Sequence, residues 1–175
     1  VNTKAPFFKD STPCVGAAVS GTANIKMIAP FNIPKKARIC IYSRAVNNTD
    51  KSEWVQQGVY FIDTRKQVHD ERGFDVLSLE AFDAMMLSEV TYPSDNQHNY
   101  PLLGKEIVQF IADNMKINAD GSGVRVDPRT LEIMTAGYKF PLPVGYSMRE
   151  VLCMIAAAYA GNFIISPTGD LRLVS

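Results

Sequence analysis

The chain has 175 residues, of which 46% are hydrophobic and 21% are charged. This composition can bury a core and is not that of a disordered protein, and the length fits one sizeable domain or two small ones. Eighteen Lys and Arg residues balance 18 Asp and Glu residues, so no global charge attracts nucleic acid or anionic lipid. The longest apolar run, residues 151–160, is about half of what a membrane-spanning helix needs. We therefore expect neither a nucleic-acid partner nor a membrane partner.

The first half of the chain is predicted to be mostly β. Its N-terminus, beginning with Val1, resembles neither a signal peptide nor a natural gene start, which indicates a fragment of a longer protein. We expect an early strand or hairpin broken by Gly21, and a bulge or kink at Gly58 in a later strand. The expected strands cover residues 15–29, 37–46, 54–65 and 74–82, where apolar and polar residues alternate or β-branched and aromatic residues are frequent. Their short connections predict an antiparallel meander.

The composition changes at residues 92–101, a polar segment with a proline near each end. Such a segment suits a link between two units. The sequence therefore predicts an α+β fold, with an antiparallel β domain over residues 1–92 and a small α/β domain over residues 93–175.

The second half begins with a predicted amphipathic helix over residues 105–115. Its polar residues fall on the face opposite a continuous apolar stripe. Residues 124–143 are expected to form one or two short extended pieces, interrupted at residues 135–137. The stripe consists of Ile107, Val108, Ile111, Ala112 and Met115.

The strongest local signal is the S-x-x-E spacing of Ser147 and Glu150. In this capping box each side chain satisfies a free backbone N–H at the start of a helix. We expect a largely buried helix over residues 148–160, and a C-terminal hairpin over residues 163–174 with a tight turn. Ser147 is not expected to be a nucleophile, because Arg149 occupies the position where a nucleophile elbow needs glycine.

The sequence offers little support for catalysis, for a metal or for a cofactor. His69 and His98 have no second ligand at helical spacing, and no phosphate-binding or dinucleotide-binding motif is present. Three cysteines without a C-x-x-C motif predict free, mostly buried thiols. These are Cys14, Cys40 and Cys153. We therefore expect no enzyme, no metal and no cofactor.

Aromatic residues provide the only candidate ligand site. Aromatic faces stack well on sugars and peptides, although aromatic residues on strands more often belong to a core or a sheet face. The candidate stacking residues are Trp54, Tyr60, Tyr92 and Tyr100.

Several segments together resemble tail-hub proteins of phages and prophages, the proteins of the tail tip or baseplate. The resemblance covers roughly residues 38–175. It lies in the strands of residues 53–64 and 76–87, including the Phe82-Asp83-Ala84-Met85 segment, and in residues 105–115, 146–165 and 169–173.

This resemblance implies a β-barrel-like domain related to the tail-tube subunit, followed by a small inserted α/β domain with two helices and a C-terminal hairpin. It also implies a homotrimer that joins the tail tube to the tip and contacts other tail proteins of the tube, distal tail, spike or fibre. The implied location is the virion tail, after assembly in the bacterial cytoplasm. Members of the family are longer, so the barrel of this chain is expected to be incomplete.

Two alternatives stay open at this point. One is a receptor- or carbohydrate-binding module of a tail tip, which the four aromatic residues would serve if they form an exposed cluster. The other is a fragment of a tail-associated peptidase, which would require a cysteine close to His69 or His98.

Overall fold

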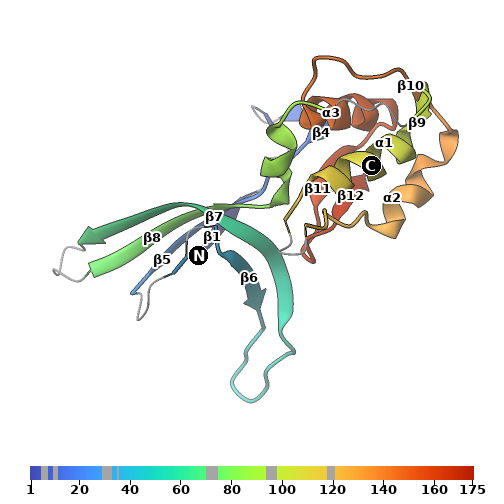
Figure 1. Ribbon diagram of the computed structural model, residues 1–175. Coiled ribbons are helices and arrows are strands. Elements are labelled where there is room, and N and C mark those ends of the chain that lie inside the picture. The colour runs from blue at the N-terminus through green and yellow to red at the C-terminus, as the bar shows by residue number, and fades with distance from the viewer. Residues whose placement is uncertain are drawn as a thin grey trace.

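The computed structural model describes residues 1–175 apart from residues 5–7, 10–11, 29–32, 35, 70–74, 94–97 and 118–120. A long, curved antiparallel sheet lies on one side of the molecule, and a unit of helices with a small sheet lies on the other (Figure 1). The fold is therefore mixed α+β, as expected.

The larger sheet contains five strands in the order β1-β5-β8-β7-β6. They are β1 (Asn2–Lys4), β5 (Thr22–Met27), β6 (Arg38–Ser43), β7 (Val55–His69) and β8 (Asp75–Phe82). Small or branched residues such as Ala23, Ile62 and Leu79 are buried on one face, which explains the alternating pattern in the sequence. The predicted strands of the meander are confirmed. β7 is longer than expected, because it extends to His69.

This sheet is open, which corrects the barrel that the resemblance implies. Its edges are β1 and β6, and no strand of the described residues pairs the two edges. Closing a sheet into a barrel requires the first and last strands to pair. The described strands therefore form an open sheet of five neighbours in a row, without a pairing of β1 to β6.

The helical unit surrounds a three-stranded sheet in the order β12-β11-β4. Its helices are α1 (Gly104–Asn114), α2 (Pro128–Ile133) and α3 (Met148–Ala158), with the 3₁₀ helices η1 (Ala84–Glu89) and η2 (Met134–Ala136). The short strands of the chain are β2 (Phe8–Lys9), β3 (Thr12–Pro13), β4 (Ala17–Ala18), β9 (Leu102–Leu103), β10 (Lys139–Phe140), β11 (Asn162–Ile165) and β12 (Leu171–Val174). β11 and β12 form the predicted C-terminal hairpin.

Local sequence signals explain two of these helices. All five residues of the predicted apolar stripe, four on α1 and Met115 directly after it, are completely buried. At the start of α3, the Ser147 hydroxyl accepts a hydrogen bond from the Glu150 N–H at 3.2 Å, and the Glu150 carboxylate accepts one from the Ser147 N–H at 2.7 Å. Both predictions are therefore confirmed.

The expectation of extended structure over residues 124–143 is wrong for its central part. This region contains α2 and η2, so the described residues of the unit form three α-helices and not the two expected. Asp127 caps α2 by accepting a hydrogen bond from the Arg129 N–H at 3.0 Å, and Pro128 supplies a first helical residue with a suitable fixed φ.

The main core lies within the helical unit and also includes residues that precede position 92. Ala18, Ala84 and Met85 pack with buried residues of α1, α3 and the small sheet. β4 pairs in parallel with β11, so the chain leaves the larger sheet after β1, passes through the helical unit and returns to the larger sheet at β5. The division at residue 92 stays a prediction. None of the helices in the described residues has the length and apolar character needed to cross a bilayer.

Candidate functional site

The larger sheet joins the helical unit at Asp83, which follows β8 and caps η1. Its carboxylate accepts hydrogen bonds from the Gly21 N–H at 2.6 Å, the Met85 N–H at 3.0 Å and the Ser20 hydroxyl at 3.2 Å. The residue is only 6% exposed. Asp83 therefore ties the connection between β4 and β5 to the connection between β8 and η1.

Burial has the largest effect on the pKa of Asp83. It raises this pKa from 3.8 to about 6, although the donors from Gly21, Met85 and Ser20 and the charge of Arg149 each lower it. Burial disfavours the charged form, while hydrogen bonds to the carboxylate favour it. The connection between the larger sheet and the helical unit thus contains a carboxyl group whose pKa lies at about 6.

A second contact between the two parts comes from the turn that connects β11 and β12. The side-chain amide of Gln56, on β7, donates to the Pro167 carbonyl at 2.9 Å. Gly169 in this turn has a φ of +94°, and a Cβ atom there would lie 3.4 Å from a methyl group of Val59 on β7. Glycine is suited to this position because it adopts positive φ without strain.

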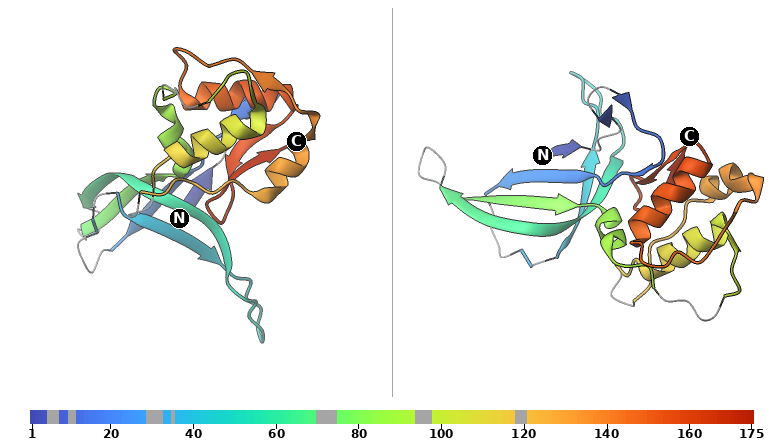
Figure 2. Two further views of the ribbon diagram at one scale, coloured as in Figure 1. Left: turned by 45° about the vertical axis from the view of Figure 1, so that its right-hand side comes forward. Right: turned by 90° about the horizontal axis from the view of Figure 1, so that it is seen from above.

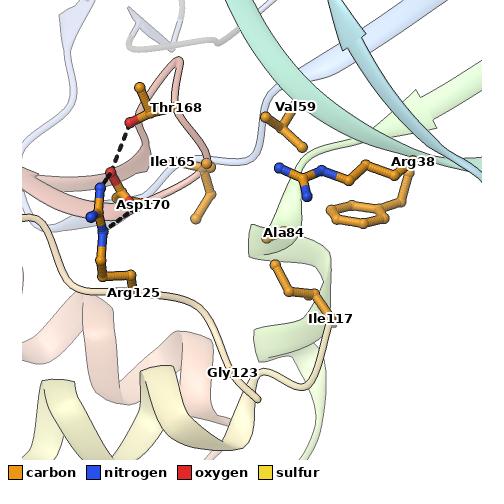
Figure 3. A pocket seen from close by; sticks show the side chains of 11 residues that line it. Arg38, Val59, Ala84, Ile117, Gly123, Arg125, Ile165, Thr168 and Asp170 are labelled. Atoms are coloured by element: carbon orange, nitrogen blue, oxygen red, sulfur yellow. Dashed lines mark hydrogen bonds and ion pairs between the residues drawn. The ribbon is translucent and has the colours of Figure 1, made fainter. Parts of the chain in front are cut away.

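Between these two contacts lies a cavity of about 140 Å³ (Figure 3). Val59 of β7, Ala84 of η1 and Ile165 of β11 give it apolar walls. Arg38 of β6 lies on one side, and Arg125 with Asp170 lies on the opposite side. Segments far apart in the sequence therefore form a single partly polar cavity.

Arg125 and Asp170 form a bidentate ion pair at the edge of this cavity. The Arg125 Nε donates to Asp170 Oδ1 at 2.9 Å and Nη2 donates to Oδ2 at 2.8 Å, while the Thr168 hydroxyl donates to Oδ2 at 2.7 Å. The hydrogen bonds from Arg125 are the largest of the effects that lower the pKa of Asp170. The carboxylate is therefore ionised near neutral pH and accepts three side-chain hydrogen bonds.

The loop between β6 and β7 forms an arm that projects away from the rest of the molecule (Figures 1 and 2). Its turn is well ordered by hydrogen bonds, because the Asn47 side chain accepts from the N–H groups of Thr49 and Asp50 at 2.9 and 2.7 Å. Trp54 on this arm is 58% exposed, and the guanidinium of Arg44 lies 4.5 Å from the centre of its ring.

The structure separates the four candidate stacking residues. Trp54 is exposed on the arm, whereas Tyr60 is buried against Ala23 and Ala81 in the larger sheet. Only Tyr92 and Tyr100 meet, with 2.9 Å between their hydroxyl oxygens. Tyr92 is buried, so the four rings do not form one exposed cluster.

The remaining candidates for chemistry are dispersed. Cys14 and Cys153 are partly buried and Cys40 is exposed, so the expectation of mostly buried thiols is wrong for Cys40, which lies on an edge strand. His69 pairs with Asp75 at 2.8 Å, and His98 packs edge-on against Phe110. Within the part of the chain that the structure describes, no group of three His, Cys, Asp or Glu residues could hold a metal ion.

Sequence reasoning identified neither Asp83 nor Arg38 as a functional residue. Asp83 has a local signal, since an aspartate directly after a strand and before a short helix is a common cap. Arg38 has none, because its surroundings come from several segments that lie about 20 to 130 positions away in the chain.

Comparison of the sequence with models of protein families and with curated proteins finds no match. The fold is similar to that of the 43 kDa tail protein of prophage MuSo2 from Shewanella oneidensis, with a TM-score of 0.54 and 10% sequence identity. The similarity covers 98% of this chain and 51% of that one, so this chain spans about half the length of the tail protein. At this identity the two proteins share a fold.

Proposed function

We propose that this chain is a structural part of a phage or prophage tail, at the hub or tip that joins the tail tube to the parts beyond it. The observation that carries the proposal is the fold shared with a prophage tail protein over 98% of the chain. A similar fold does not by itself determine function, so the role must also suit the surfaces of this molecule.

The open edges of the larger sheet support an architectural role. Within the described residues, β1 and β6 each have a neighbouring strand on one side only. Such edges present backbone N–H and C=O groups that readily pair with a further strand. In the proposed role these edges pair with other strands in the assembled tail, and copies of the chain form a homotrimer.

The connection between the larger sheet and the helical unit also suits a structural role, because several contacts hold the two parts together. Asp83 connects them through hydrogen bonds from two separate segments, and the turn at Gly169 packs on β7. The arm at Trp54 adds an exposed, ordered projection that can contact a neighbouring tail protein. The proposed role is non-enzymatic, with assembly in the bacterial cytoplasm and a final location in the virion tail.

Immunogold electron microscopy of particles released from the bacterium that encodes the chain tests this proposal. Antibodies against the chain should label one end of the tail, and mass spectrometry of the purified tails should detect its peptides. Antibodies against the main tube protein, which label the whole length of the tail, provide the control. Label distributed along the tube, or purified tails without the chain, would contradict the proposed function.

A further inference from the structure

We propose that the cavity between the larger sheet and the helical unit binds a carboxylate group on a short apolar stem, with Arg38 as its charged partner. This inference goes beyond the proposed function, and its test does not depend on tail assembly.

The side chain of Arg38 lies on the side of the larger sheet that faces the cavity. Arg38 pairs directly with Phe61 across strands β6 and β7. Paired residues on neighbouring strands project from the same face of a sheet, and both residues line the cavity. In Figure 3 the guanidinium of Arg38 extends between Val59, Ile165 and Ala84. The sheet register therefore places Arg38 on the face of the larger sheet that borders the cavity.

The positive charge of Arg38 is not compensated within the described part of the chain. Arg38 has no hydrogen-bond or ion-pair partner among the described residues of the chain. Asp170 makes no ion pair with Arg38, and its carboxylate instead accepts hydrogen bonds from two nitrogens of Arg125 and from the Thr168 hydroxyl. One positive charge therefore remains in the cavity, and a single negative charge complements it.

The shape of the guanidinium and the apolar walls of the cavity favour a carboxylate on an apolar stem. A guanidinium presents two parallel N–H donors that match the two oxygens of a carboxylate. The walls next to it are hydrocarbon, from Val59, Ala84 and Ile165, and they suit methylene groups. A divalent phosphate would need more donors than Arg38 alone provides, and it would place charged oxygens against these walls.

The volume limits the ligand to a small group. A cavity of about 140 Å³ holds a carboxylate with a few methylene groups but not a large ligand such as a sugar ring with its substituents. Two sources have this chemistry, a free short-chain carboxylic acid and the glutamate or aspartate side chain of a protein. Arg38 is an exposed residue, which leaves a path for either.

Nuclear magnetic resonance titration of the 175-residue chain provides the test. The probes are butyrate, the uncharged butyramide of the same shape, inorganic phosphate, and a blocked Ala-Glu-Ala peptide. The signals followed are the Arg38 side-chain N–H groups and the methyl groups of Val59 and Ile165. The variants are Arg38→Gln and Arg38→Lys, with Arg44→Gln as a matched control on the arm outside the cavity.

We expect saturable shifts of these signals with butyrate, and none with butyramide or phosphate. Arg38→Gln should weaken butyrate binding by at least about tenfold, because a charge-assisted hydrogen bond is lost. Arg38→Lys should weaken it less, and Arg44→Gln should leave it unchanged. Thermal melts that match the unsubstituted chain show that the variants are folded.

Tighter binding of the peptide than of butyrate assigns the site to a protein side chain, and binding of butyrate alone assigns it to a free acid. Both results support the proposal. It is overturned if neither carboxylate binds, if phosphate or butyramide binds as well as butyrate, or if Arg38→Gln leaves the affinity unchanged in a folded protein.

Discussion

Replacement of Asp83 by Asn should change the pH dependence of stability in a defined direction. The pKa of Asp83 is raised by burial to about 6 in the folded protein, whereas its ordinary value is 3.8. The folded protein therefore binds this proton more tightly than the unfolded chain does. Protonation of Asp83 stabilises the fold, so this contribution is fully present below pH 4 and is lost as the pH rises through 6.

The magnitude follows from the two pKa values. A difference of about two pH units corresponds to about 3 kcal/mol in the free energy of unfolding, and about 2 kcal/mol of it falls between pH 4 and pH 7. Asn cannot titrate. The stability of the unsubstituted protein relative to Asp83→Asn should therefore fall by about 2 kcal/mol over this range.

Equilibrium unfolding in urea, followed by circular dichroism at several pH values, measures this difference. The comparison removes the contributions of Asp127, Asp170 and Glu150, whose lowered pKa values act in the opposite direction at more acidic pH. Asn keeps only one acceptor oxygen, so Asp83→Asn also has a constant cost of about 1–3 kcal/mol at every pH. Parallel stability curves for the two proteins between pH 4 and pH 7 would refute the reasoning, as would a relative gain in stability of the unsubstituted protein.

Three further substitutions, two of them with a control variant, test the packing and the helix signals by urea unfolding. Gly123→Ala places a Cβ atom 2.1 Å from the Ala112 carbonyl oxygen and should lower the free energy of unfolding by about 2–4 kcal/mol. The control Gly145→Ala, at a position with positive φ but open space, should lower it by about 1 kcal/mol. Equal losses in the two variants would contradict the predicted clash. Ser147→Ala removes the cap of α3 and should cost about 1 kcal/mol, and an unchanged midpoint would show that the cap does not contribute. Ile155→Ala, at a completely buried position on α3, should lower the free energy of unfolding by about 2–5 kcal/mol. The control Met154→Ala, at a neighbouring position that is 41% exposed, should lower it by less than about 1 kcal/mol. A larger loss for Met154→Ala than for Ile155→Ala would contradict the assignment of the buried face of α3.

Elements with a strong local signal were predictable from the sequence. The apolar stripe of α1 and the capping box of α3 depend on residues within one or two helical turns, and the structure confirms both. α2 carries a comparable signal in Asp127 and Pro128, a cap followed by a proline suited to the first helical turn. The break at residues 135–137 favours extended pieces on either side of it, and this interpretation is wrong for α2.

Features that depend on distant residues were not predictable. The parallel pairing of Ala17–Ala18 with β11 joins residues about 145 positions apart, and no pattern in the sequence marks it. Whether the larger sheet closes depends on edge pairing between β1 and β6, which alternation within each strand does not specify. The surroundings of Arg38 likewise come from several separate segments, so its place in a cavity becomes visible only in the folded molecule.

Electron cryomicroscopy of intact tails, at a resolution that separates strands, is the measurement that bears most directly on the architectural role. We predict density for the five-stranded sheet and its helical unit at one end of the tail tube, with the β1 and β6 edges each paired to a further strand. Tails in which this fold is missing from the end of the tube, or in which both edges face solvent, would contradict the proposed role.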